Sequence, residues 1–70
     1  MMPLTIANQN DEYTIQKVGG SSEIRAHLEN LGFVEGGKVR IVSSMGGNLI
    51  TSVKDSRIAL SRELATKIMV

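Results

Sequence analysis

The stretch "HLENLGFVEGGKVRIV", residues 27–42, decides the fold, because within it a helical pattern gives way to a strand pattern. Around its start, Ile24, Leu28 and Leu31 are spaced at i, i+4 and i+7, which places them on one face of a helix. Ser21 is of a type that favours the N-cap position. The spacing therefore predicts a helix that begins after Ser21 and ends near Leu31.

The glycine after Leu31 predicts how this helix ends. Gly32 is expected to adopt the left-handed conformation that only glycine adopts at low cost. Phe33 then stands where helix ends of this type place an apolar residue against Leu28. Gly36 lies further on, next to a second glycine, and is expected to form a turn with close backbone approach. Because these glycines lead into a strand, they do not match a phosphate loop, which leads into a helix.

The remaining elements are mostly short strands. After Lys38 the apolar residues alternate, with Val39 and Ile41 on one face of a strand. The glycines of "SMGGN" predict a hairpin, and "KDSR" predicts a second tight turn. Ser61 is the expected N-cap of a short helix. The predicted strands are residues 12–18, 38–44, 48–54, 57–60 and 67–70, and the short helix is residues 62–67.

Composition favours a small intracellular domain. The chain of 70 residues has a formal net charge of +1 and no cysteine. This length predicts one domain, residues 1–70. No apolar run approaches the length of a membrane span, and the start lacks the pattern of a signal peptide. We therefore expect a cytoplasmic protein without membrane insertion. The balanced charge is not typical of a nucleic-acid-binding protein.

Two long segments together resemble the FeoA family. They are "LENLGFVEGGKVRIV" and "SRIALSRELATKIMV", and the resemblance extends from Leu4 to Val70. Leu60, in the second segment, is one of its most specific positions. The resemblance implies a mainly β protein with short helices, folded as a small SH3-like β-barrel. The family is related to the C-terminal domain of DtxR-type repressors.

The resemblance also implies a function. FeoA proteins are small, non-enzymatic cytoplasmic accessory proteins of bacterial ferrous iron uptake, thought to act on the membrane transporter FeoB, which carries a GTPase domain. The expected partner is therefore the cytoplasmic region of FeoB, whose activity the chain would modulate. No cofactor is implied. Two positions depart from the usual family pattern: Ser61 replaces a basic residue and is followed by Arg62, and Gly46-Gly47-Asn48 replaces an Asp-Pro step.

Few residues are candidates for metal binding or catalysis. Glu23 and His27, four residues apart on the predicted helix, could reach one metal ion. Two ligands are too few for a tight site, which usually has three or four. The single histidine and the absence of cysteine also leave little for nucleophilic catalysis. The chain is predicted not to be an enzyme and to hold no resident metal.

The expected partner surface lies at the hairpin tip. Met45 is an apolar residue beside flexible glycines, where a purely structural loop would more naturally be polar. The surface is predicted to combine this tip with exposed basic residues that steer an acidic partner. Its members are Met45, Gly46, Gly47, Asn48, Lys54, Arg57 and Lys38.

Two alternative functions remain at this point. The segment "VEGGKVRIVSSMGG" also resembles the pattern of KOW-type SH3-like barrels, which would make the chain a nucleic-acid or ribosome-associated module. With Tyr13 and Phe33 as its only aromatic residues, the chain has little with which to stack on bases. The other alternative is a stand-alone relative of the repressor domain that binds a peptide segment.

Overall fold

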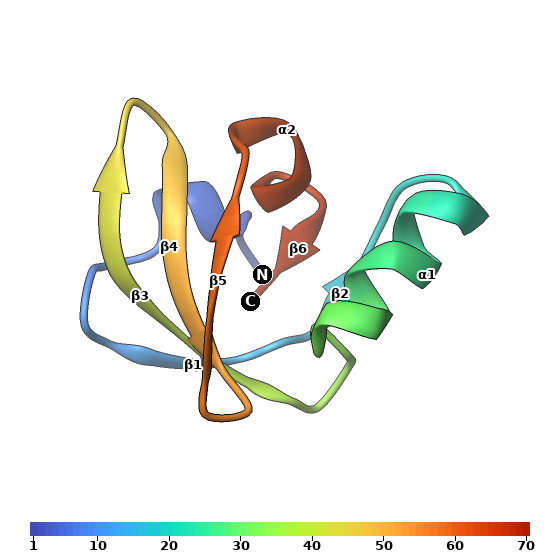
Figure 1. Cartoon of the computed structure of the whole chain (residues 1–70), viewed down its shortest axis with the longest axis horizontal. Coiled ribbons are helices and arrows are strands. Elements are labelled where there is room, and N and C mark those ends of the chain that lie inside the picture. The colour runs from blue at the N-terminus through green and yellow to red at the C-terminus, as the bar shows by residue number, and fades with distance from the viewer.

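The computed structural model describes all residues, 1–70, and is mainly β with two short α-helices (Figure 1). Along the chain the elements are η1 (Leu4–Ile6), β1 (Glu12–Thr14), β2 (Lys17–Val18), α1 (Ser22–Leu31), β3 (Lys38–Met45), β4 (Asn48–Val53), β5 (Ser56–Leu60), α2 (Arg62–Ala65) and β6 (Ile68–Met69). This order agrees with the predicted succession of strands and helices. The short helix ends at Ala65, two residues earlier than predicted.

The strands form two separate antiparallel sheets. One has four strands in the order β1-β3-β4-β5, and the other consists of β2 and β6. The prediction of a barrel is wrong in one respect, since the large sheet does not close on itself by hydrogen bonding. The two ends of the chain pair with each other next to the small sheet. Met2 and Val70 exchange two backbone hydrogen bonds of 2.8 Å, and both termini lie near the centre of Figure 1.

The predicted strand at residues 12–18 is divided between the two sheets. Ile15 pairs outside β1, since its N–H donates to Gly37 O and its carbonyl accepts from Gly36 N, each at 2.8 Å. The next residue, Gln16, donates to Met69 O in the other sheet at 2.8 Å. Two residues therefore oppose one, which is the arrangement of a β-bulge with glycine in the left-handed region; Gly36 has φ +83°. Gly36 and Gly37, which follow α1, thus pair with Ile15, the residue at which the chain passes from the large sheet to the small one.

The end of α1 follows the prediction. Gly32 has φ 108° and donates to Glu29 O at 2.9 Å, and Phe33 donates to Leu28 O at 3.0 Å. This pair of bonds defines the Schellman motif. Leu28 and Phe33 are both fully buried. At the other end of the helix, the Ser21 side chain accepts a hydrogen bond from Ile24 N, as the N-cap prediction requires.

Twelve buried hydrophobic residues form one core between the two sheets and under the helices. They are Leu4, Ile15, Val18, Leu28, Phe33, Val39, Ile41, Leu49, Val53, Leu60, Ala65 and Ile68. Thr51 is the buried polar residue of this core, and its hydroxyl donates to Ile58 O at 2.8 Å. Burying these side chains supplies the main driving force of folding in a chain that has no disulfide.

An irregularity in β3 determines which side chains face outward near the hairpin tip. The pairing of β3 with β4 shifts between Ile41 and Ser43. Ile41 is buried, whereas Ser43 is exposed and lies opposite exposed Ile50. In an uninterrupted strand, residues two apart share a face, so a shift of one residue moves the following side chains to the other face. The bulge therefore directs Ser43 and Met45 away from the core.

Candidate functional site

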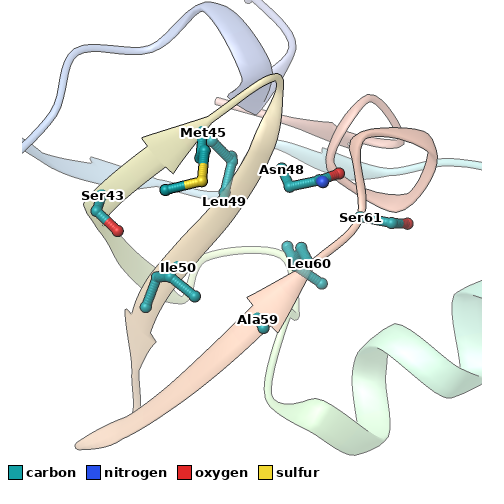
Figure 2. A pocket seen from close by; sticks show the side chains of 8 residues that line it. All are labelled: Ser43, Met45, Asn48, Leu49, Ile50, Ala59, Leu60 and Ser61. Atoms are coloured by element: carbon teal, nitrogen blue, oxygen red, sulfur yellow. The ribbon is translucent and has the colours of Figure 1, made fainter.

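An apolar groove of about 490 Å³ lies on the outer side of the β3–β4–β5 region. Eight residues line it, five of them hydrophobic, and they come from the ends of β3 and β5, the start of β4 and Ser61 (Figure 2). Ser43, Ile50 and Ala59 occupy one row across the three strands, because Ser43 pairs with Ile50 and Ile50 with Ala59. The groove thus has a floor of small and apolar side chains.

Met45 is the most exposed of the large hydrophobic residues that line the groove. Its exposed fraction is 83%, compared with 38% for Ile50. Figure 2 draws Met45 at the end of β3, above Ser43 and Ile50 in the view. The prediction that Met45 is presented at the hairpin tip, and not buried, is confirmed. Leaving a large apolar side chain in water has a cost that contact with a partner would remove.

The hairpin tip is a tight two-residue turn. Gly46 and Gly47 have φ values of 60° and 88°, and they alone separate β3 from β4. Positive φ at both positions of a two-residue turn is the type I′ geometry that suits a hairpin. A Cβ atom on Gly47 would lie 2.5 Å from Arg62 Cδ, so the Arg62 side chain lies directly against this glycine. The tip is therefore held in place by its neighbour.

Asn48 attaches the tip to α2, whose N-cap is Ser61. The Asn48 Oδ1 atom accepts a hydrogen bond of 3.0 Å from the backbone N–H of Arg62. Ser61 Oγ accepts from Leu64 N at 3.3 Å and caps the short helix. Arg62 is thus the basic residue closest to the tip, and the sequence-based selection omitted both Arg62 and Ile50. The departure from the family pattern at residues 61–62 was the available signal for Arg62.

The predicted partner surface is divided by the structure. The hairpin tip and the Lys54–Asp55 turn lie at opposite ends of β4, as Figure 1 shows. Lys38 starts β3 next to the pair formed by Val39 and Val53, so it lies at the same end as Lys54. Arg57 pairs with Ser52 near that end as well. The prediction that these cations adjoin the tip is therefore wrong. The Gly46–Gly47 turn precedes β4 and the Lys54–Asp55 turn follows it, so the two turns lie at opposite ends of that strand.

The candidate metal ligands lie apart from the groove. Glu23 and His27 are both exposed on α1, far along the chain from the hairpin. The structure brings no group of three or more His, Cys, Asp or Glu residues together in a way that could hold a metal ion. Both side chains lie on the surface of α1, four residues apart.

Together these features describe a small binding module with an apolar groove beside a fixed hairpin tip. The serines along the groove have no histidine near them, and none of the helices has the length and hydropathy of a membrane span. The fold and the groove alone do not specify what is bound.

Comparison with known proteins identifies the family. The family model for the FeoA domain matches residues 2–70. Fe(2+) transport protein A of Methanocaldococcus jannaschii is 34% identical over 70 residues, which are 100% of this chain and 85% of that protein. The chain therefore belongs to the FeoA family, and it is an accessory protein of ferrous iron transport.

Two solved structures show the same fold. A crystal structure of the iron uptake regulatory protein FeoA has a TM-score of 0.91 at 26% identity, over 99% of this chain and 93% of the other. The zinc complex of Stenotrophomonas maltophilia FeoA, described as a prokaryotic SH3 domain protein, has a TM-score of 0.86 at 28% identity, over 100% of this chain and 89% of the other. The SH3-like fold expected from the sequence is confirmed.

Proposed function

We propose that this chain binds a cytoplasmic region of the ferrous iron transporter FeoB through the hairpin tip and the apolar groove, and thereby modulates the transporter. The carrying observation is Met45, which is 83% exposed at the edge of an apolar groove. Binding sites of proteins commonly contain an apolar anchor at a preformed concave surface, with polar groups at the rim. The membership in the FeoA family supports a partner in iron transport.

The fixed geometry of the tip also supports a binding role. The type I′ turn, the Arg62 side chain against Gly47 and the hydrogen bond from Arg62 N to Asn48 hold the tip in one arrangement. A preformed surface loses less conformational entropy on binding than a flexible loop does. The backbone that carries Met45 therefore needs little ordering on binding.

The basic residues at the other end of β4 form a separate group. Lys38, Lys54 and Arg57 are exposed and distant from Met45 along the strands. In this proposal Lys38 and Lys54 act by long-range attraction of an acidic partner, which changes the association rate more than the affinity. The family match gives no support to the nucleic-acid alternative, and a steep dependence of any RNA binding on salt would be needed to revive it.

The proposal is tested by titrating the soluble cytoplasmic region of FeoB into the isotope-labelled chain and following amide shifts. We expect the largest shifts at residues 43–50 and 59–62. Met45→Asp should weaken binding by about 2 kcal/mol, about thirtyfold, as the loss of a hot-spot anchor does. The matched control is Ile6→Asp, which also places a carboxylate at an exposed apolar residue, 65% exposed, but in η1.

The outcomes are distinct. Shifts confined to α1 around His27, or equal loss of binding in both variants, would contradict the assignment of the groove. The modulation is measured separately, as GTP hydrolysis by the full-length transporter with the wild-type chain and with Met45→Asp. If the variant changes hydrolysis as much as the wild type does, the groove does not mediate the effect.

A further inference from the structure

Strand β5 is an edge of the large sheet, and it adjoins the groove. The sheet order β1-β3-β4-β5 leaves β5 paired with β4 on one side only. An unpaired strand edge presents N–H and C=O groups that can accept another strand, and proteins usually cover or interrupt such edges. Here the edge carries Arg57 and Ala59, both of which are exposed.

The turn before β5 determines which backbone groups point outward. Lys54 and Asp55, with φ values of 48° and 63°, form a two-residue turn closed by the Val53–Ser56 pair. The pair that closes such a hairpin exchanges hydrogen bonds, and bonded and non-bonded pairs then alternate along the ladder.

The alternation makes Ser52–Arg57 and Ile50–Ala59 non-bonded pairs. The N–H and C=O groups of Arg57 and Ala59 therefore point away from β4. None of the backbone hydrogen bonds outside the regular elements involves either residue. The outer edge of β5 thus has two consecutive bonding positions that the chain itself leaves unused.

The side chains beside these positions differ in chemistry. Ala59 is part of the groove floor with Ile50. Arg57 lies in the next row, which also contains Ser52 and Arg40, because Ser52 pairs with both. The two positions share the outer face, since they are two residues apart on one strand. A strand added along β5 would therefore place one side chain opposite Ala59, by the apolar groove. Its side chain two residues further on would lie on the same face, opposite Arg57.

The other edge of the sheet lacks this combination. β1 has three residues, and its register places Glu12 next to Arg40. Beyond β1, the edge of β3 is also occupied. Asn10 N donates to Ile41 O, and Gln9 Nε2 donates to Val42 O. The groove lies next to β5 and not next to β1.

We propose that the edge of β5 binds an extended peptide segment as an additional antiparallel strand, and that the segment carries an apolar residue opposite Ala59 and an acidic residue opposite Arg57. Antiparallel pairing places the apolar residue first, so the segment reads apolar–any–acidic from its N-terminus. Backbone hydrogen bonds provide affinity in this mode of recognition, and side chains at alternate positions provide specificity. The inference rests on the proposed function, because we expect this segment to be part of the cytoplasmic region of FeoB.

The experiment uses two capped peptides that differ in one residue, Ser-Thr-Leu-Val-Glu-Thr-Ser and Ser-Thr-Leu-Val-Lys-Thr-Ser. We expect the glutamate peptide to shift the amides of Arg57 and Ala59 most and to slow their exchange with solvent. The lysine peptide should bind about fivefold more weakly, in the range of one exposed ion pair. Arg57→Glu should reverse this preference and make the lysine peptide the stronger ligand.

A proline substitution tests the backbone contact. Ala59→Pro removes only the outward N–H, a position where an edge strand tolerates proline. It should abolish binding of the glutamate peptide, while Ala59→Ser, which retains the N–H, should bind it like the wild type. If Ala59→Pro does not fold, the charge reversal at Arg57 still decides the question.

Several results would overturn the proposal. They are no binding of the glutamate peptide, equal binding of both peptides by the wild type, and shifts that leave Arg57 and Ala59 unchanged. Failure of the proposed function has a different signature, because the peptide assay contains no transporter. In that case the glutamate peptide binds β5 while the FeoB region does not bind at all. If the FeoB region shifts Met45 but leaves Arg57 and Ala59 unprotected, the groove assignment stands and the strand addition is wrong.

Discussion

The side chain of Asn48 and the backbone of Arg62 are joined by a hydrogen bond of 3.0 Å, which connects the hairpin tip to the first turn of α2. The two residues are fourteen positions apart in the sequence. The bond gives the tip a second point of attachment besides the β3–β4 ladder. It also places the Arg62 side chain against Gly47, at the end of the groove where Met45 is exposed.

Removing this bond should loosen the tip. Asn48→Ala is expected to lower the free energy of unfolding by about 1 kcal/mol, the typical contribution of one hydrogen bond. Urea denaturation measures this change. Asn48→Asp is the matched control, because its carboxylate retains an acceptor for Arg62 N. Equal destabilisation by both substitutions would show that the acceptor is not what stabilises the tip.

The helix end should depend on Gly32. Because this residue has φ 108°, Gly32→Ala is expected to cost about 1 kcal/mol or more, although its Cβ would meet only ordinary contacts beginning at 3.5 Å. Gly19→Ala is the control, since its φ is not positive and its nearest contact, Lys67 O, is also at 3.5 Å. That variant should change stability by less than about 0.5 kcal/mol. A Gly32→Ala protein as stable as the wild type in urea would contradict the Schellman assignment.

The buried hydroxyl of Thr51 should stabilise the β4–β5 pair. Thr51→Val retains the shape but removes the donor to Ile58 O at 2.8 Å, so we expect a loss of about 1 kcal/mol. Ser52→Ala, at the neighbouring half-buried position, is the control and should change stability by less than about 0.5 kcal/mol. The measurement is again equilibrium unfolding in urea. An unchanged or increased stability of Thr51→Val would show that this bond contributes nothing net.

Folding should not require a metal ion. The structure contains no group of three or more potential His, Cys, Asp or Glu ligands, and structural metal sites need such a set to supply folding energy. Thermal unfolding curves recorded with and without an excess of a strong chelator should therefore coincide. If the chelator lowers the Tm by several degrees, His27→Ala and Glu23→Gln should each reproduce the loss in the absence of chelator.

Local features were predictable because neighbouring residues determine them. The spacing of Ile24, Leu28 and Leu31 identified the helix, and the type of residue at positions 21 and 32 identified its two ends. The two tight turns were predictable for the same reason, since positive φ restricts the residues that can form them.

The candidate site was predictable only in part. An exposed Met45 followed from its place beside two glycines, whereas the floor of the groove comes from strands paired in a particular register. The accompanying cations were wrongly expected beside the tip, because the order of residues along a chain does not say which turns share an end of a sheet. Arg62 contacts the tip from the start of α2. Its bonding partner Asn48 is fourteen positions earlier in the sequence, too far for a local sequence pattern to predict the contact.

The sequence by itself determined the helix and its caps, the succession of short strands, the positions of the turns and membership in the FeoA family. These depend on residue type, on period and on local backbone preference. Only the tertiary structure decided that residues 12–18 divide between two sheets, that a bulge turns Met45 outward, and that β5 keeps an open edge beside the groove. Each of these follows from pairing between distant segments, which depends on packing and hydrogen bonding of the whole chain.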